Sequence, residues 1–211
     1  MRLLVLFVIA VLAGAGATRA ADVRVATLAP VEDMSLPFWC DWGYDWDERC
    51  YREDGLRLGV GGDVDKVWRS ALLFSTAALP AGVRVETAEL WLWYDQTCIG
   101  PRKTSRPCDG RAFQFAGHPI LSPRWFDERE VELGPHAGAA ALPAGAAPQW
   151  VALDLTDLVA DWVSGAQPNN GVLVKLSDAQ EEYGFGGPLF PSSSDGNASL
   201  RPRLTVWYLP D

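Results

Sequence analysis

The sequence predicts an all-β protein, an antiparallel β-sandwich with one short helix. Short stretches in which apolar and polar residues alternate recur between turns that contain glycine and proline, and this spacing is typical of sandwiches and barrels. A single segment has helical periodicity, and strands do not alternate with helices as they do around a parallel sheet. No internal repeat occurs at a fixed period.

The first twenty residues have the layout of a secretory signal peptide. Arg2 precedes an apolar run over residues 3–12, and small residues follow up to Ala20, which is the order of parts in such peptides. The apolar run is too short to span a bilayer. We expect cleavage after Ala20, with Ala17 as the second choice. Residues 21–211 then form a single domain that is secreted, periplasmic or on the cell surface.

The charge of the chain excludes two classes of partner. Removing Arg2 and Arg19 with the signal peptide takes the net charge from -9 to -11. An acidic surface of this kind repels nucleic acid and anionic membranes, and no later apolar run predicts membrane insertion. Neutral ligands, basic proteins or divalent cations remain as partners.

The four cysteines predict two disulfides, Cys40–Cys50 and Cys98–Cys108. An even number of cysteines in an exported chain favours disulfides, although three pairings are possible. The two sequence-local pairs have equal spacing, and each closed loop would contribute roughly 2–3 kcal/mol. The rival interpretation is one zinc ion bound by four thiolates, but the close paired spacing of zinc knuckles is missing.

Three predicted strands lie between residues 56 and 94. Residues 56–60 alternate and stop at two glycines, and residues 70–74 form a buried strand before a Leu-Pro-Ala-Gly turn. Residues 87–94 alternate most clearly. Their alternation places Glu89, Trp91 and Trp93 on the face opposite Ala88, Leu90, Leu92 and Tyr94.

The rest of the chain contains further strands and the one helix. A loop rich in alanine, glycine and proline is expected over residues 134–148. The helix is expected over residues 156–164, with Thr156 as its amino-terminal cap and Leu158, Val159 and Trp162 on one face. Trp162 and Trp207 are expected in the core. The strands are predicted at residues 111–115, 130–133, 150–155, 171–176 and 203–208.

Four segments, in order, resemble the disaggregatase-related, or DNRLRE, domains. Residues 69–92 match a strand of the form R-x-x-L-x-F, an L-P-x-G turn and an A-x-L-x-L strand. Residues 150–162 (WVALDLTDLVADW) match a strand that ends in aspartate and a D-x-T-x-x-V-x-x-W helical turn. Residues 170–174 and 201–208 match the N-x-G strand and the P-x-L-x-V-x-Y terminus. Residues 25–33 and 58–61 are weaker matches to the first two strands.

This resemblance implies a jelly-roll-like sandwich of the kind found in carbohydrate-binding modules. Related modules bind acidic polysaccharides such as alginate, and comparable sandwiches often carry a structural calcium ion. The segments Cys40–Cys50 and Cys98–Cys108 are insertions relative to the family pattern, so the resemblance assigns no binding residue to either of them. An acidic protein would also need calcium or a local basic groove to hold an acidic polysaccharide.

Aromatic residues are the candidate sugar-binding groups. Flat apolar rings stack on pyranose rings, and nearby carboxylates accept hydrogen bonds from sugar hydroxyls. The alternative is that the same rings fill a small core beneath a disulfide. The candidates are Trp39, Trp42, Tyr44 and Trp46 in the first cysteine loop, and Trp91 and Trp93 on the strand.

Two groups of acidic residues are candidate calcium ligands, because calcium prefers hard oxygen ligands on loops. They are Asp41, Asp45 and Asp47 in the first cysteine loop, and Asp63 with Asp65. Neither group follows the EF-hand pattern, and solvated acids explain both groups equally well.

Little in the sequence indicates catalysis. His118 and His136 adjoin prolines without an evident nucleophile nearby, and no G-x-S-x-G motif occurs. Asp45 with Glu48, or Asp127 with Glu128, are the carboxylate pairs considered for glycoside cleavage.

The predicted function is therefore an exported, non-catalytic module. It would bind a polysaccharide, or serve as a surface or matrix component that contacts an extracellular protein. The alternative is a polysaccharide-degrading enzyme, a lyase or glycosidase, that uses loop carboxylates.

Overall fold

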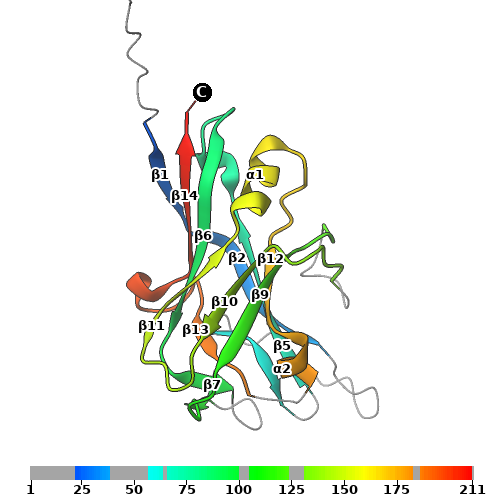
Figure 1. The fold of residues 1–211 in the computed structure, drawn as a ribbon, viewed down its shortest axis with the longest axis vertical. Coiled ribbons are helices and arrows are strands. Elements are labelled where there is room, and N and C mark those ends of the chain that lie inside the picture. The colour runs from blue at the N-terminus through cyan, green and yellow to red at the C-terminus, as the bar shows by residue number, and fades with distance from the viewer. Residues whose placement is uncertain are drawn as a thin grey trace, which may run out of the picture.

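The structure is a computed structural model that describes residues 22–38, 57–63, 66–99, 105–123, 131–182 and 186–210. Strands dominate it, with two short α-helices, α1 and α2, and two short 3-10 helices (Figure 1). The elements in chain order are β1 (Arg24–Leu28), β2 (Pro30–Phe38), β3 (Arg57–Gly59), β4 (Gly61–Asp63), β5 (Lys66–Phe74), η2 (Thr76–Ala78), β6 (Arg84–Tyr94), β7 (Thr97–Ile99), β8 (Ser105–Pro107), β9 (Phe113–Pro119), β10 (Gly138–Leu142), β11 (Gln149–Asp154), α1 (Thr156–Ser164), β12 (Val172–Leu176), α2 (Asp178–Glu182), β13 (Leu189–Pro191), η4 (Ala198–Leu200) and β14 (Arg203–Leu209).

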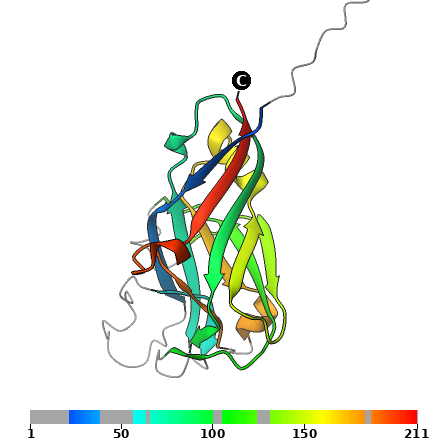
Figure 2. The ribbon, with the colours of Figure 1, turned by 90° about the vertical axis from the view of Figure 1, so that its left-hand side faces the viewer.

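Two antiparallel sheets pack against each other. The four-stranded sheet has the order β1-β14-β6-β11, and the six-stranded sheet has the order β10-β9-β12-β5-β2 with β4 beside β5. Figure 2 shows the first sheet, with β14 between β1 and β6. Because β1 pairs with β14 in the register Arg24↔Tyr208, the first and last described strands lie side by side.

The core lies between the sheets and follows the predicted alternation. On β6 the inward side chains of Ala88, Leu90, Leu92 and Tyr94 are buried, and the intervening residues are partly exposed. Leu204, Val206 and Tyr208 on β14 are buried in the same core. The all-β prediction of packed antiparallel sheets with a short helix is confirmed.

Helix α1 begins and ends for local reasons. The Oδ1 atom of Asp154 accepts hydrogen bonds from the backbone N–H (2.9 Å) and the hydroxyl (2.6 Å) of Thr156. The Thr156 Oγ1 atom accepts a third bond, from the backbone N–H of Ala88 at 3.0 Å. Gly165 ends the helix with φ 76°, a left-handed conformation that favours glycine.

Several local predictions are wrong. Thr156 is the first helical residue and not the cap, because Asp154 supplies the oxygen that an amino-terminal cap would provide. The expected loop at 134–148 contains strand β10, whose Gly138–Leu142 backbone pairs with β9 although its alanines carry little strand signal. Trp207 is half-buried on the outward face of β14, since the core positions of that strand belong to its neighbours Val206 and Tyr208.

The remaining elements extend the predictions. The strand expected at 111–115 runs from Phe113 to Pro119, and the five-residue helix α2 was not predicted. Of the strand expected at 130–133, Glu130 lies outside the described residues, and residues 131–133 form only an isolated bridge, between Leu133 and Ile120, so this prediction is also wrong. Within the described ranges, no helix is long and apolar enough to cross a membrane.

Candidate functional site: an outward-facing tryptophan cluster and a groove on the opposite sheet

The outward face of the four-stranded sheet carries a cluster of aromatic side chains. Trp91 and Trp93 lie on β6, and both are partly exposed. Trp150 on β11 is the cross-strand partner of Trp93, and Arg203 on β14 is the cross-strand partner of Trp91. We call these four residues, Trp91, Trp93, Trp150 and Arg203, the tryptophan face.

The rings and the guanidinium of the tryptophan face contact one another. Trp93 and Trp150 meet edge to face, with ring centroids 5.4 Å apart and an interplanar angle of 66°. The Arg203 guanidinium carbon lies 4.0 Å from the Trp150 centroid and 6.0 Å from the Trp91 centroid. These are cation–π distances, so the cluster is a packed surface layer outside the main core.

Polar residues border the tryptophan face on the next row of the sheet. Glu89 is the cross-strand partner of both Thr205 on β14 and Asp154 on β11. A carboxylate pair therefore lies one row away from Trp91. This arrangement combines flat apolar rings with hydrogen-bond acceptors, the two kinds of group that recognise a sugar.

The structure places only part of the sequence-predicted site. Trp91 and Trp93 lie together as expected, whereas Trp150 and Arg203 were not recognised as site residues. Residues 150–154 alternate, so Trp150 faces away from the side that buries Val151 and Leu153. This alternation could have identified Trp150 as an outward-facing residue. The sequence alone did not show that β11 and β14 pair with the two edges of β6.

The other predicted site residues stay predictions. Trp39, Asp41, Trp42, Tyr44, Asp45, Trp46, Asp47 and Asp65, together with Cys40 and Cys50, lie outside the described residues. The backbone of Asp63 belongs to β4, and its side chain is outside the description. Cys98 and Cys108 form the predicted disulfide, with Cα atoms 5.0 Å apart.

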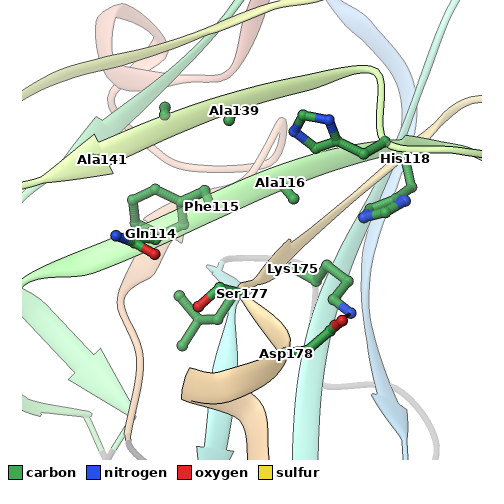
Figure 3. A pocket seen from close by; sticks show the side chains of 12 residues that line it. Gln114, Phe115, Ala116, His118, Ala139, Ala141, Lys175, Ser177 and Asp178 are labelled. Atoms are coloured by element: carbon green, nitrogen blue, oxygen red, sulfur yellow. Dashed lines mark hydrogen bonds and ion pairs between the residues drawn. The ribbon is translucent and has the colours of Figure 1, made fainter.

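A groove of about 700 Å³ lies on the outward face of the six-stranded sheet. Alanine side chains on β9 and β10 line part of it, which leaves space above these strands. Figure 3 shows Lys175 reaching the carboxylate of Asp178, with Ala116 and Ala139 on the neighbouring strands. We call this groove on the six-stranded sheet the histidine groove, because His118 and His136 also line it.

Ion pairs fix the side of the histidine groove that β12 and α2 form. Lys175, 8% exposed, pairs with Asp178 and lies 3.4 Å from Glu181 Oε2. Glu181, also 8% exposed, accepts two hydrogen bonds from Arg69, at 3.1 and 2.8 Å. The hydrogen bond and the charge of Lys175 lower the pKa of Asp178, which stays ionised as a result.

His118 lies between the groove and the loop before β10. Its Nδ1 atom is 3.1 Å from the carbonyl oxygen of Gly134. Because a carbonyl can only accept, Nδ1 carries the proton and donates, and Nε2 keeps its lone pair. Burial lowers the pKa of His118, and the charge of Lys175 and the neighbouring His136 act in the same direction, while the Gly134 bond opposes them.

Neither surface supplies a complete set of ligands for a metal ion. Across the part of the chain that the structure describes, no three histidine, cysteine or acidic side chains gather in a suitable cluster. A second pocket, of about 440 Å³ beside α1, is lined by Glu86, Asp154 and Asp157, and solvated carboxylates account for it. Comparison of the chain with protein-family models and with curated proteins finds no match.

Proposed function

We propose that the chain is an exported, non-catalytic β-sandwich module that binds a polysaccharide on its tryptophan face. The observation that carries this proposal is the cross-strand packing of Trp91, Trp93 and Trp150 on an outward sheet surface. A ring that served only the fold would be expected to point between the sheets, where the core lies. These three rings instead remain partly exposed to solvent.

The arrangement suits a sugar for two physical reasons. Strands hold the rings in a fixed geometry, so little side-chain entropy is lost when a ligand stacks on them. Arg203 offers guanidinium N–H donors beside the rings, and no carboxylate within salt-bridge distance of it is found among the described residues. Hydroxyl or carboxylate oxygens of a sugar can accept from these donors.

Export and calcium are further parts of the proposal. The Cys98–Cys108 disulfide supports export, because disulfides persist in oxidising compartments. Calcium is proposed as a structural ion held by the acidic residues between positions 41 and 65, whose oxygen ligands suit it. The resemblance to DNRLRE domains supports a jelly-roll arrangement of the strands.

A second candidate function is glycoside cleavage, favoured by one observation. Glu89 and Asp154 are cross-strand neighbours beside Trp91. Glycosidases use two carboxyl groups that flank the scissile bond, and this pair places two carboxyl groups next to the aromatic rings. Reducing-end release from a bound polysaccharide, abolished in Glu89→Gln, would establish this activity in place of simple binding.

The test of the proposed function is a polysaccharide array probed with the mature chain, with and without calcium. We expect Trp93→Ala and Trp150→Ala to lose binding about fivefold or more, since each removes a stacking surface worth about 1 kcal/mol or more. Trp207→Ala is the matched control, because Trp207 lies on the same sheet beside Thr87, outside the cluster. It should bind within about twofold of the parent.

Two results would overturn the proposed function. Equal binding by the parent, Trp93→Ala and Trp150→Ala would move the sugar site away from the tryptophan face. Binding of no glycan by the parent would favour the structural alternative, in which the same rings contact an extracellular protein. Circular dichroism of each variant ensures that lost binding reflects the site and not the fold.

A further inference from the structure

The only two histidines of the chain lie side by side at one end of the histidine groove. His118 belongs to β9, and His136 stands two residues before β10. Their ring centroids are 6.0 Å apart, and their planes meet at 69°. The β9–β10 pairing, in the register Gly117↔Gly138, brings these two distant positions together.

We propose that His118 and His136 form a binding site for a divalent transition-metal ion such as Zn²⁺, Ni²⁺ or Cu²⁺. Imidazole nitrogen is a preferred ligand for these ions. With metal–nitrogen bonds of about 2.1 Å, two imidazoles on one ion have ring centroids about 5–6 Å apart. The separation in the structure already reaches that range, and the exposed His136 is free to adjust its ring.

The hydrogen bond of His118 matches what a metal-ligating histidine requires. A ligating imidazole nearly always donates its second ring N–H to a carbonyl or carboxylate, which fixes the tautomer and the ring plane. The Nδ1–H of His118 donates to the Gly134 carbonyl at 3.1 Å. Its Nε2 lone pair is thereby left for a ligand.

The charges around the pair allow a cation to bind. The charge of the Lys175 ammonium acts on His118, and Asp178 and Glu181 both pair with this ammonium. The net charge of -9 on the chain favours accumulation of cations around the protein.

Two protein ligands leave coordination positions open. The described residues offer no third histidine, cysteine or acidic ligand in the same cluster. Water or an added ligand would fill the remaining positions, and the adjoining groove of about 700 Å³ provides the space. The site is therefore open, in contrast to the closed four-ligand sites that serve structural roles.

The test is isothermal titration calorimetry of the chain, purified without a polyhistidine tag, with ZnCl₂. We expect one site, with affinity reduced at least tenfold in both His136→Ala and His118→Asn. His136 is exposed, so its replacement leaves the fold intact. Ser177→Ala, which alters the same groove without removing an imidazole, is the matched control and should bind within about twofold of the parent.

Electron paramagnetic resonance with Cu²⁺ separates this site from carboxylate binding elsewhere. Coupling to two imidazole nitrogens in the parent, reduced to one in His136→Ala, would support the proposal. Zn²⁺ affinity that is unchanged in His136→Ala would overturn it, and so would the absence of Zn²⁺ binding at millimolar concentrations. Neither result depends on whether the tryptophan face binds a glycan.

Discussion

Arg203 lies over the ring of Trp150, with its guanidinium carbon 4.0 Å from the ring centroid. The same carbon is 6.0 Å from the centroid of Trp91, so β14 contributes a cation to rings from two other strands. Arg203 therefore joins three strands through contacts outside the main core.

Replacement of Arg203 by alanine should lower the free energy of unfolding by about 1 kcal/mol. A partly exposed cation–π contact is worth about 0.5–1 kcal/mol, and the packing of the side-chain stem adds to it. Urea denaturation followed by tryptophan fluorescence measures the change. Arg84→Ala is the control, since its ion pair with Glu86 is exposed and should contribute about 0.5 kcal/mol or less. Equal effects of the two substitutions would contradict a structural role for the Arg203 contact.

Replacement of Glu181 by alanine should be far more damaging, at about 3–5 kcal/mol. Glu181 is 8% exposed and receives two hydrogen bonds from Arg69, while the buried Lys175 lies within 3.4 Å. Its removal takes from Arg69 and Lys175 the carboxylate that they share in a low-dielectric environment, while Lys175 keeps its ion pair with Asp178. Chemical denaturation gives the difference, and Glu86→Ala supplies an exposed carboxylate for comparison. A loss of less than about 1 kcal/mol would show that water reaches these cations.

Tyr94 should make stability depend on pH in the alkaline range. Burial raises the pKa of Tyr94 above its ordinary value of 10.0, and the charges of Asp95 and Asp109 raise it further. Between the two pKa values the folded chain holds a proton that the unfolded chain has released. The contribution is therefore complete below about pH 10 and is lost as the pH rises through the folded-state pKa.

Ultraviolet titration at alkaline pH checks the behaviour of Tyr94. The parent should show one tyrosine that ionises later than the others, and Tyr94→Phe should remove that step. The stability of Tyr94→Phe should also fall less steeply above pH 10. A parent spectrum in which every tyrosine ionises together would contradict the prediction.

The alternation in residues 87–94 was enough to predict which β6 side chains face the core, because a strand has a side-chain period of two. The expectation that Trp207 lies in the core conflicts with the same rule, because Val206 and Tyr208 take the inward positions of β14 on either side of it. Strand β10 was missed because alanine is a weak strand former and long-range pairing with β9 stabilises it.

The candidate sites were harder to predict than the fold. Trp91 and Trp93 share one strand, so alternation alone put them on one face. Arg203 joins them only because β14 pairs with β6 in a register that sets it beside Trp91. His118 and His136 likewise meet through the pairing of β9 with β10. Sheet order and register arise from tertiary packing, and neither can be read from a local pattern.

The Cys98–Cys108 disulfide should contribute about 3 kcal/mol, because it closes a short loop in the unfolded chain. Chemical denaturation of the Cys98→Ala, Cys108→Ala double variant measures this loss. The predicted Cys40–Cys50 bond closes a loop of the same length, so the Cys40→Ala, Cys50→Ala variant should lose a similar amount. Peptide mapping without reductant should find two linked pairs, each joining cysteines ten positions apart. Free thiols at Cys40 and Cys50 in the oxidised chain would refute the Cys40–Cys50 bond. The Cys40→Ala, Cys50→Ala variant would then lose no free energy of unfolding from loop closure.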